Sequence, residues 1–341
     1  MKKTKIAWLL LGAALAAGCA KERTVSGNED NKAYIEAWLQ SRYPGVSASG
    51  VGIYVLSDEP GSGSAYDGED YIYVEYTVRD LEGNITYTND RKLAQQVGTY
   101  VPSYYYGPTV VIAGHESLQV GLEAMITGMK PGGTRTTLIP DWLLTYNRYG
   151  SAAQYLQKAK AGNNVNSIYT VTLKEIIEDE GKWELDSLRR YLARHAPDAV
   201  AIHEKDEEED AEDSFFYAQK IAPSDTTSFP QDTTIYINYT GRLLNGQVFD
   251  TTIKDTAKVH NIYSSSKTYE PVKVNWAEKF TGITLNGSSV IEGFSRTLWQ
   301  MRAHEKGVGY FVSSLGYASS GSGGTIPAYS PLIFEIEIVD N

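Results

Sequence analysis

One carboxylate stands out among the residues able to do chemistry. Asp250 directly follows Phe249 within a run of alternating residues that predicts a β-strand. A charged side chain next to a half-buried strand face is unfavourable unless it has a partner or a task, so Asp250 is the first candidate site residue. The five histidines show no metal-ligand spacing, and the chain has neither a GxSxG nor a P-loop pattern. We therefore expect no metal ion and no cofactor.

Asp250 belongs to one of four short blocks that lie between residues 232 and 340. The blocks are Tyr239-Thr240-Gly241, Gly246-Gln247-Val248-Phe249-Asp250, Val290-Ile291-Glu292-Gly293-Phe294, and a tail from Leu315-Gly316-Tyr317 through Gly321 and Ile326-Pro327 to Leu332-Ile333-Phe334. In this order and spacing they resemble the FKBP-type peptidyl-prolyl cis-trans isomerases. The resemblance implies an antiparallel sheet wrapped around a short helix, and an enzyme that isomerises X-Pro peptide bonds.

The resemblance also implies a role for each of nine residues. Asp250 would hydrogen-bond near the twisted amide or to Tyr239, while the Tyr317 hydroxyl and the main-chain N–H of Ile291 would donate to substrate carbonyls. Substrate binding would fall to six aromatic or apolar residues: Tyr239, Phe249, Val290, Phe294, Ile326 and Phe334. Phe294 would form the pocket floor, where the family usually has Trp. Taken singly, the aromatic residues fit an ordinary core equally well, so the interpretation depends on the whole set.

These residue types suit the reaction that the resemblance implies. The X-Pro bond has a rotation barrier of about 18–20 kcal/mol because resonance keeps it planar. Rotation needs no nucleophile, metal ion or proton abstraction, so the lack of a catalytic triad is expected. An apolar aromatic pocket tolerates the twisted amide better than water does, and a few fixed hydrogen bonds hold the neighbouring groups.

The chain departs from the family pattern around this site. Family members often carry an Arg shortly after the Phe-Asp pair, but residues 251–255 contain none. The segment Lys258–Phe280 is longer than usual and is expected to reshape that wall. A common His of the last loop is Ser322, and the Pro expected after Ile-Pro is Ala328. These changes are expected to lower the activity or to alter the residue preferred before proline.

The elements that would position these residues occur twice in the chain. Tyr76 and Gly83 match Tyr239 and Gly246 at an offset of 163, residues 118–129 match 290–301 at an offset of 172, and Ile168 matches Leu332 at an offset of 164. Apolar residues with helical spacing precede each copy: Ile35, Trp38 and Leu39, then Leu185, Leu188 and Leu192. The alternating strands and Gly-rich turns lack a βαβ rhythm. We therefore predict two homologous α+β domains, each preceded by a helix.

The first copy has lost the candidate site residues. Its counterpart of the Phe-Asp pair is Thr86-Tyr87, and its counterpart of the aromatic floor is Leu122. Near the position of Tyr317 it has Leu144-Thr145-Tyr146, which would displace the hydroxyl by one residue. These losses predict a domain that keeps the fold without catalysis. Its longer loop 147–164 would either plug the cleft or form a new recognition surface.

The N-terminus has the pattern of a lipoprotein signal peptide. Three lysines precede the apolar run Ile6–Ala17, which is too short to span a bilayer, and small residues precede Cys19, the only cysteine. This resembles a bacterial lipobox, although Ala16 stands where Leu is usual. The resemblance implies lipidation at Cys19 and a membrane-anchored cell-envelope lipoprotein, periplasmic or surface-exposed. An ordinary secretion signal with an accidental cysteine is the alternative.

The charge balance narrows the choice of partners. The net charge is -11, and an acidic run at 204–213 has the pattern of a solvated linker. Nucleic acid is not an expected partner, because it requires clustered Lys and Arg.

The predicted organisation has five parts. These are a signal peptide and lipobox over 1–19, a tether over 20–30, a degenerate FKBP-like domain over 31–180, a linker helix, acidic run and leading strand over 181–231, and an isomerase domain over 232–341. We expect the C-terminal domain to isomerise X-Pro bonds in unfolded or flexible extracytoplasmic polypeptides. The alternative is a non-catalytic peptide-binding chaperone or adaptor lipoprotein of the same fold.

Overall fold

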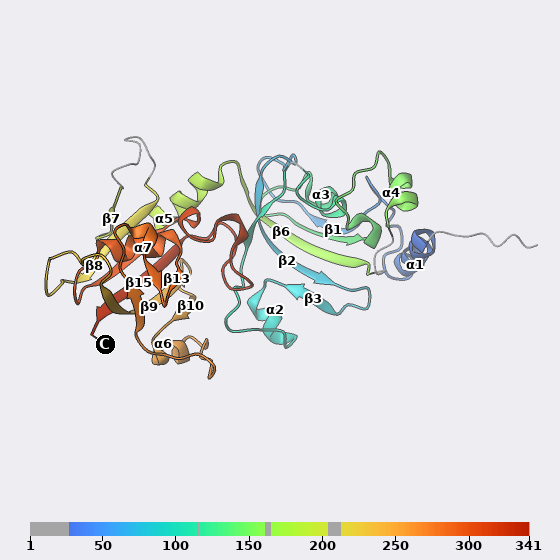
Figure 1. The fold of residues 1–341 in the computed structure, drawn as a ribbon. Coiled ribbons are helices and arrows are strands. Elements are labelled where there is room, and N and C mark those ends of the chain that lie inside the picture. Colours follow the sequence, from blue (N-terminus) through green and yellow to red (C-terminus); the bar gives the residue numbers. More distant parts are fainter. Residues whose placement is uncertain (1–26, 115, 161–164, 204–212, 341) are drawn as a thin grey trace, which may run out of the picture.

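A computed structural model of the chain describes residues 27–114, 116–160, 165–203 and 213–340. These residues form two sheet-based units, one after the other along the chain, with helix α5 (Glu180–His195) following the last strand of the first unit (Figure 1). Within them no helix is long and apolar enough to cross a membrane. The predicted signal peptide, Cys19 and most of the tether lie outside the described residues.

The first unit is a six-stranded antiparallel sheet in the order β1-β5-β6-β2-β3, with β4 also paired to β2. Its strands are β1 (Tyr54–Glu59), β2 (Tyr71–Arg79), β3 (Ile85–Thr88), β4 (Thr109–Ile112), β5 (Thr134–Ile139) and β6 (Ser167–Ile177). Its helices are α1 (Gly27–Arg42), α2 (Arg91–Gln96), α3 (Val120–Ile126) and α4 (Ala152–Lys158), with the 3-10 turn η1 (Asp141–Leu143). Alternate residues of β2, Ile72 and Val74, are buried in one core with Met125 of α3, as period-two patterning requires.

The second unit repeats this plan with additional strands, in the order β13-β12-β11-β9-β15-β14-β8-β7, with β10 paired to β9. Its strands are β7 (Val200–Ala201), β8 (Phe215–Ile221), β9 (Thr234–Leu243), β10 (Val248–Thr251), β11 (Val272–Asn275), β12 (Thr284–Leu285), β13 (Ser288–Ser289), β14 (Lys306–Phe311) and β15 (Leu332–Val339). Its helices are α5, α6 (Lys254–Val259) and α7 (Glu292–Gln300), with the 3-10 turns η2 (Phe280–Gly282), η3 (Ser313–Leu315) and η4 (Ala318–Ser320).

The two units share one topology. The order β8-β14-β15-β9 repeats β1-β5-β6-β2, and the central strand of each unit pairs with two further short strands. Local details recur as well: the hydroxyls of Thr77 and Thr88 lie 2.9 Å apart, as do those of Thr240 and Thr251. The predicted architecture of two α+β domains, each preceded by a helix, is therefore confirmed.

Strand pairing corrects one expected match between the copies. Val78 pairs with Tyr169 in the first unit, and its counterpart Gly241 pairs with Phe334 in the second. Tyr169 is thus the counterpart of Phe334, so Ile168 corresponds to Ile333 and not to Leu332. The single-residue difference matters because it decides which side chains of the last strand face the core.

Strand pairing also shows where the second unit has more residues than the first. Ile112 of β4 and Asn275 of β11 pair with the first residues of their central strands, still at an offset of 163. The offset has reached 172 at Gly121 and Gly293. The extra residues therefore follow Asn275, where η2 and the β12–β13 hairpin lie.

Helix α5 and strand β8 pack into the second unit, although they fall in the segment 181–231 expected to include a linker. Leu185, Leu188 and Leu192 of α5 share a buried cluster with Phe216 and Tyr310 of this sheet. The acidic run 204–213 lies outside the described residues except for Asp213, which is bound by Arg189 at 3.2 Å and His203 at 2.9 Å. The part of this segment that the structure describes is thus a layer of the second unit.

Candidate active site

All nine sequence-predicted site residues lie around one cavity of about 560 Å³ in the second unit. Strands β9, β10 and β15 supply three aromatic residues and a carboxylate, the start of α7 supplies the floor, and the loop before β15 supplies the rim. The complete lining is Tyr239, Phe249, Asp250, Leu285, Ser289, Val290, Ile291, Phe294, Tyr317, Ser322, Thr325, Ile326 and Phe334.

The floor and walls of this cavity are four aromatic rings packed edge to face. Phe294 is 3% exposed, and its ring centroid lies 5.0 Å from that of Phe334 at an angle of 89°. Tyr239 contacts Phe294 at 5.4 Å, and Phe249 contacts Phe334 at 5.5 Å. Gly241 makes room for this wall, because a Cβ there would lie 2.5 Å from the Phe249 ring. The edge-to-face contacts fix the shape of an apolar pocket able to receive a small ring.

Asp250 is held from two sides. The Tyr239 hydroxyl donates to its Oδ2 at 2.6 Å, and the Lys267 ammonium forms a short ion pair with its Oδ1. Burial, followed by the charge of Asp250, raises the pKa of Tyr239 well above its usual range, so the phenol stays protonated and donates. The sequence predicted that the segment Lys258–Phe280 reshapes this wall and showed that the usual Arg is absent, but it did not single out Lys267, which lies in that segment.

Two hydrogen-bond donors at the cavity remain open to a ligand. Within the described residues neither the main-chain N–H of Ile291 nor the hydroxyl of Tyr317 has a recorded acceptor, and both residues line the cavity. Burial and the nearby Asp250 raise the pKa of Tyr317, which keeps this hydroxyl a donor at neutral pH. Their placement suits the binding of two carbonyl groups across the cavity.

The rim of the cavity is a tight loop. Ser322 and Ile326 form an isolated antiparallel β-bridge with two reciprocal hydrogen bonds. The Ser322 N–H donates to Ile326 O at 2.8 Å, and the Ile326 N–H donates to Ser322 O at 3.1 Å. Gly321 begins this loop at φ 59° and ψ -158°, a conformation open essentially to glycine alone. Ser322, which replaces the usual His, lines the cavity, whereas Ala328 lies outside it.

Helix α5 anchors the segment that leads to Tyr317. Glu184 is 4% exposed and accepts hydrogen bonds from the Ser313 hydroxyl at 2.8 Å and from the Ser313 N–H. Burial raises the pKa of Glu184 to about 7, outweighing these hydrogen bonds. The carboxyl therefore titrates near neutral pH while it holds η3, which ends two residues before Tyr317.

This pKa predicts a pH-dependent stability that Glu184→Gln should remove. Because the pKa of Glu184 in the folded state lies above the ordinary glutamate value of 4.5, the folded state binds more protons between about pH 4.5 and 7, and stability falls as pH rises through that window. We expect the free energy of unfolding of wild type, relative to Glu184→Gln, to fall by about 3 kcal/mol at most from pH 4.5 to 7.5. Urea unfolding at a series of pH values measures this, and parallel curves for the two proteins would contradict it.

The first unit has its own cavity of about 480 Å³ at the equivalent place. Tyr76, Leu122 and Tyr169 line it where the second unit has Tyr239, Phe294 and Phe334. The Tyr239–Asp250 pair is replaced by Tyr76 and Tyr87, whose rings stack at 4.9 Å. The cavity lining contains no carboxylate.

Two expectations about the first unit can be refined. Tyr146 is 65% exposed and does not line the cavity, so it does not supply a displaced counterpart of Tyr317. The described part of loop 147–164 carries α4, which packs on α1: Asn28 Nδ2 donates to Leu156 O at 3.0 Å and to Ala159 O at 2.9 Å. None of these described residues lines the cavity, so they do not plug it.

The described residues contain no group of three or more His, Cys, Asp or Glu side chains placed to hold a metal ion. The candidate site consists of aromatic walls, one held carboxylate and two open donors.

Comparison with known proteins finds one family. The family model described as FKBP-type peptidyl-prolyl cis-trans isomerase matches residues 226–339. An FK506-binding protein of Neisseria meningitidis serogroup B is 31% identical over 105 residues, which are 31% of this chain and 76% of the relative. The macrophage infectivity potentiator of Trypanosoma cruzi is 31% identical over 103 residues, 30% of this chain but only 40% of the relative, so the chain spans less than half of that protein. The crystal structure of the three FKBP domains of wheat FKBP73 aligns with 84% of this chain and 94% of its own, at 16% identity and a TM-score of 0.29.

Proposed function

The chain belongs to the family of FKBP-type peptidyl-prolyl cis-trans isomerases, and from that premise we propose that its second unit isomerises X-Pro bonds. The observation that carries the proposal is the single cavity that gathers four aromatic rings, the Tyr239–Asp250 pair and the two open donors of Ile291 and Tyr317. The first unit, which lacks this set, does not itself catalyse the isomerisation.

In this proposal the prolyl ring enters between the aromatic walls and rests on Phe294. The Ile291 N–H and the Tyr317 hydroxyl bind carbonyls on either side of the proline and fix the chain while the amide rotates. The twisted amide has lost resonance and part of its carbonyl dipole, so it is tolerated better in the apolar cavity than the planar ground state is. Asp250, held by Tyr239 and Lys267, keeps the Tyr239 ring of the wall in position and does not itself exchange a proton.

The test is direct measurement of isomerisation. We expect the full chain to accelerate cis-trans exchange of an X-Pro tetrapeptide, followed by NMR exchange spectroscopy, and to speed a proline-limited refolding reaction. Binding of the same peptides without any acceleration would instead favour the chaperone or adaptor alternative, to which the apolar cavity of the first unit would also contribute.

The cellular place of this activity is proposed from the sequence alone. We expect Cys19 to be lipidated and the chain to act on flexible proline-containing polypeptides of the cell envelope. In a bacterial host, Cys19→Ser should abolish incorporation of labelled lipid and move the protein out of the membrane fraction. A Cys19→Ser protein that still carries lipid would rule this out.

A further inference from the structure

A loop of the first unit rests on the rim of the candidate active site in the second. The Tyr105 N–H donates to Gly324 O at 2.7 Å. The Tyr104 ring lies so close to the same glycine that a Cβ on Gly324 would be 2.8 Å from it. Gly324 is the tip of the rim loop, directly before Thr325 and Ile326, which line the cavity. The first unit therefore contacts a residue that directly precedes two residues of the cavity lining.

The contacting loop, residues 97–108, is braced internally. Tyr100 and Tyr106 pack with ring centroids 5.2 Å apart, and the Tyr106 hydroxyl accepts from Val101 N–H at 2.9 Å. The Arg91 guanidinium lies over the Tyr100 ring at 5.4 Å. Such bracing lets the loop present Tyr104 and Tyr105 in fixed positions.

The second unit has the same braced loop at residues 260–271. Tyr263 and Tyr269 stack at 5.4 Å, and the Tyr269 hydroxyl accepts from Ser264 N–H at 2.9 Å. Lys267, at the position equivalent to Tyr104, forms the ion pair with Asp250. The two copies of one loop thus both act on the same cavity, one from within its own unit and one across the boundary between units.

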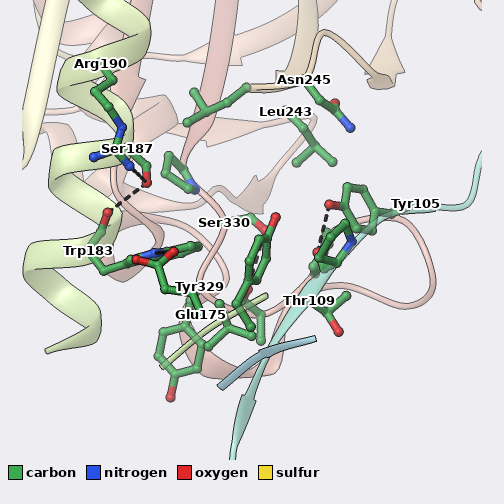
Figure 2. Close-up of a pocket in the computed structure, with 17 residues that line it drawn as sticks. Tyr105, Thr109, Glu175, Trp183, Ser187, Arg190, Leu243, Asn245, Tyr329 and Ser330 are labelled. Atoms are coloured by element: carbon green, nitrogen blue, oxygen red, sulfur yellow. Dashed lines mark hydrogen bonds between the residues drawn. The ribbon is translucent and has the colours of Figure 1, made fainter. Parts of the chain in front are cut away.

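The first unit also contacts the chain just after the rim loop, at Tyr329. The Tyr71 ring packs edge-on against Tyr329 with centroids 5.4 Å apart. Tyr329 has φ 54°, a conformation unfavourable for a bulky residue and therefore one that its surroundings must hold in place. Figure 2 shows Tyr105 and Tyr329 on the same cavity of about 330 Å³ between the units.

We propose that the first unit positions the active-site rim, with Tyr104 and Tyr105 as positioning residues that fix the loop 322–326 through Gly324. The proposal rests on the isomerase function proposed above. In this proposal the rim holds the substrate chain beside the rotating bond, so displacing it should raise KM and leave kcat within about twofold. The degenerate copy would then have kept its fold in order to shape the pocket of its neighbour.

A double-mutant cycle on the full chain tests this coupling. Gly324→Ala should raise KM for an X-Pro tetrapeptide three- to fivefold, because the new methyl group and the Tyr104 ring compete for one space. Tyr104→Ala should raise it about twofold, and adding Gly324→Ala to Tyr104→Ala should change it little further. Additive effects in the cycle would overturn the proposal. Tyr146→Ala, an exposed tyrosine of the same unit, is the matched control and should leave KM unchanged.

Two further measurements distinguish a failure of the positioning proposal from a failure of the isomerase proposal. Hydrogen exchange should find the Tyr105 amide protected in wild type, and exchange at the rate of an open amide would contradict the contact itself. If wild type binds peptide but does not turn it over, the isomerase proposal fails and the same cycle is measured on the peptide Kd. Non-additivity there would still support the positioning role, and additivity would overturn it.

Discussion

The double variant Asp250→Leu with Tyr317→Phe should lose about 100-fold in kcat/KM for an X-Pro tetrapeptide. Tyr317→Phe removes a donor to a substrate carbonyl, and Asp250→Leu removes the acceptor that orients Tyr239 at 2.6 Å. Each loss is expected to cost about 1–2 kcal/mol, which together make about two orders of magnitude. The fold should persist, because Asp250 is partly exposed at the cavity edge and the Tyr317 ring is kept.

The first unit supplies the matched control for this variant. Tyr87 occupies the position equivalent to Asp250, so Tyr87→Leu makes the same replacement in the other copy. It should leave kcat/KM within twofold of wild type, because the first cavity offers no held carboxylate. A double variant with nearly full activity, or a Tyr87→Leu protein that loses it, would show that turnover does not belong to the second cavity.

The sequence predicted which residues come together around the second cavity, because most of them are carried by regular strands and one helix start. Period-two alternation assigns Tyr239 and Phe249 to faces of β9 and β10, and the helix expected to start near Gly293 begins at Glu292. The same logic failed by one residue at Ile168. The last strand of the second copy begins with three apolar residues in succession, Leu332, Ile333 and Phe334, so its pattern lets Ile168 match either Leu332 or Ile333, and only strand pairing decides between them.

Lys267 could not be predicted from local pattern, because it reaches Asp250 from a loop 17 residues further along the chain. A signal for that loop was nevertheless present. Tyr100, Tyr106 and Pro108 recur as Tyr263, Tyr269 and Pro271 at the offset of 163 found for the central strands. No pattern in the sequence predicts how one unit is placed against the other. The Tyr105–Gly324 contact depends on the geometry of the whole connection between the two units.

Gly241→Val should remove activity. It gives the second unit the residue that the first unit has at this position. A Cβ on Gly241 would lie 2.5 Å from the Phe249 ring and 3.0 Å from the Phe334 ring. Overpacking of this kind costs about 1–3 kcal/mol, and here the strain falls on the aromatic wall of the cavity. We expect a clear drop in the urea midpoint and at least a 100-fold loss in kcat/KM.

Adding Phe249→Thr to Gly241→Val separates the two effects, since it copies the first unit's own pair, Val78 and Thr86. Threonine vacates the space that the valine needs, so the urea midpoint should return toward that of wild type. Activity should stay lost, because the wall against which the prolyl ring packs is gone. A double variant that regains turnover would show that the aromatic wall is not part of the site. If stability stays low after the wall is vacated, the steric account of why the first copy changed both positions together would be wrong.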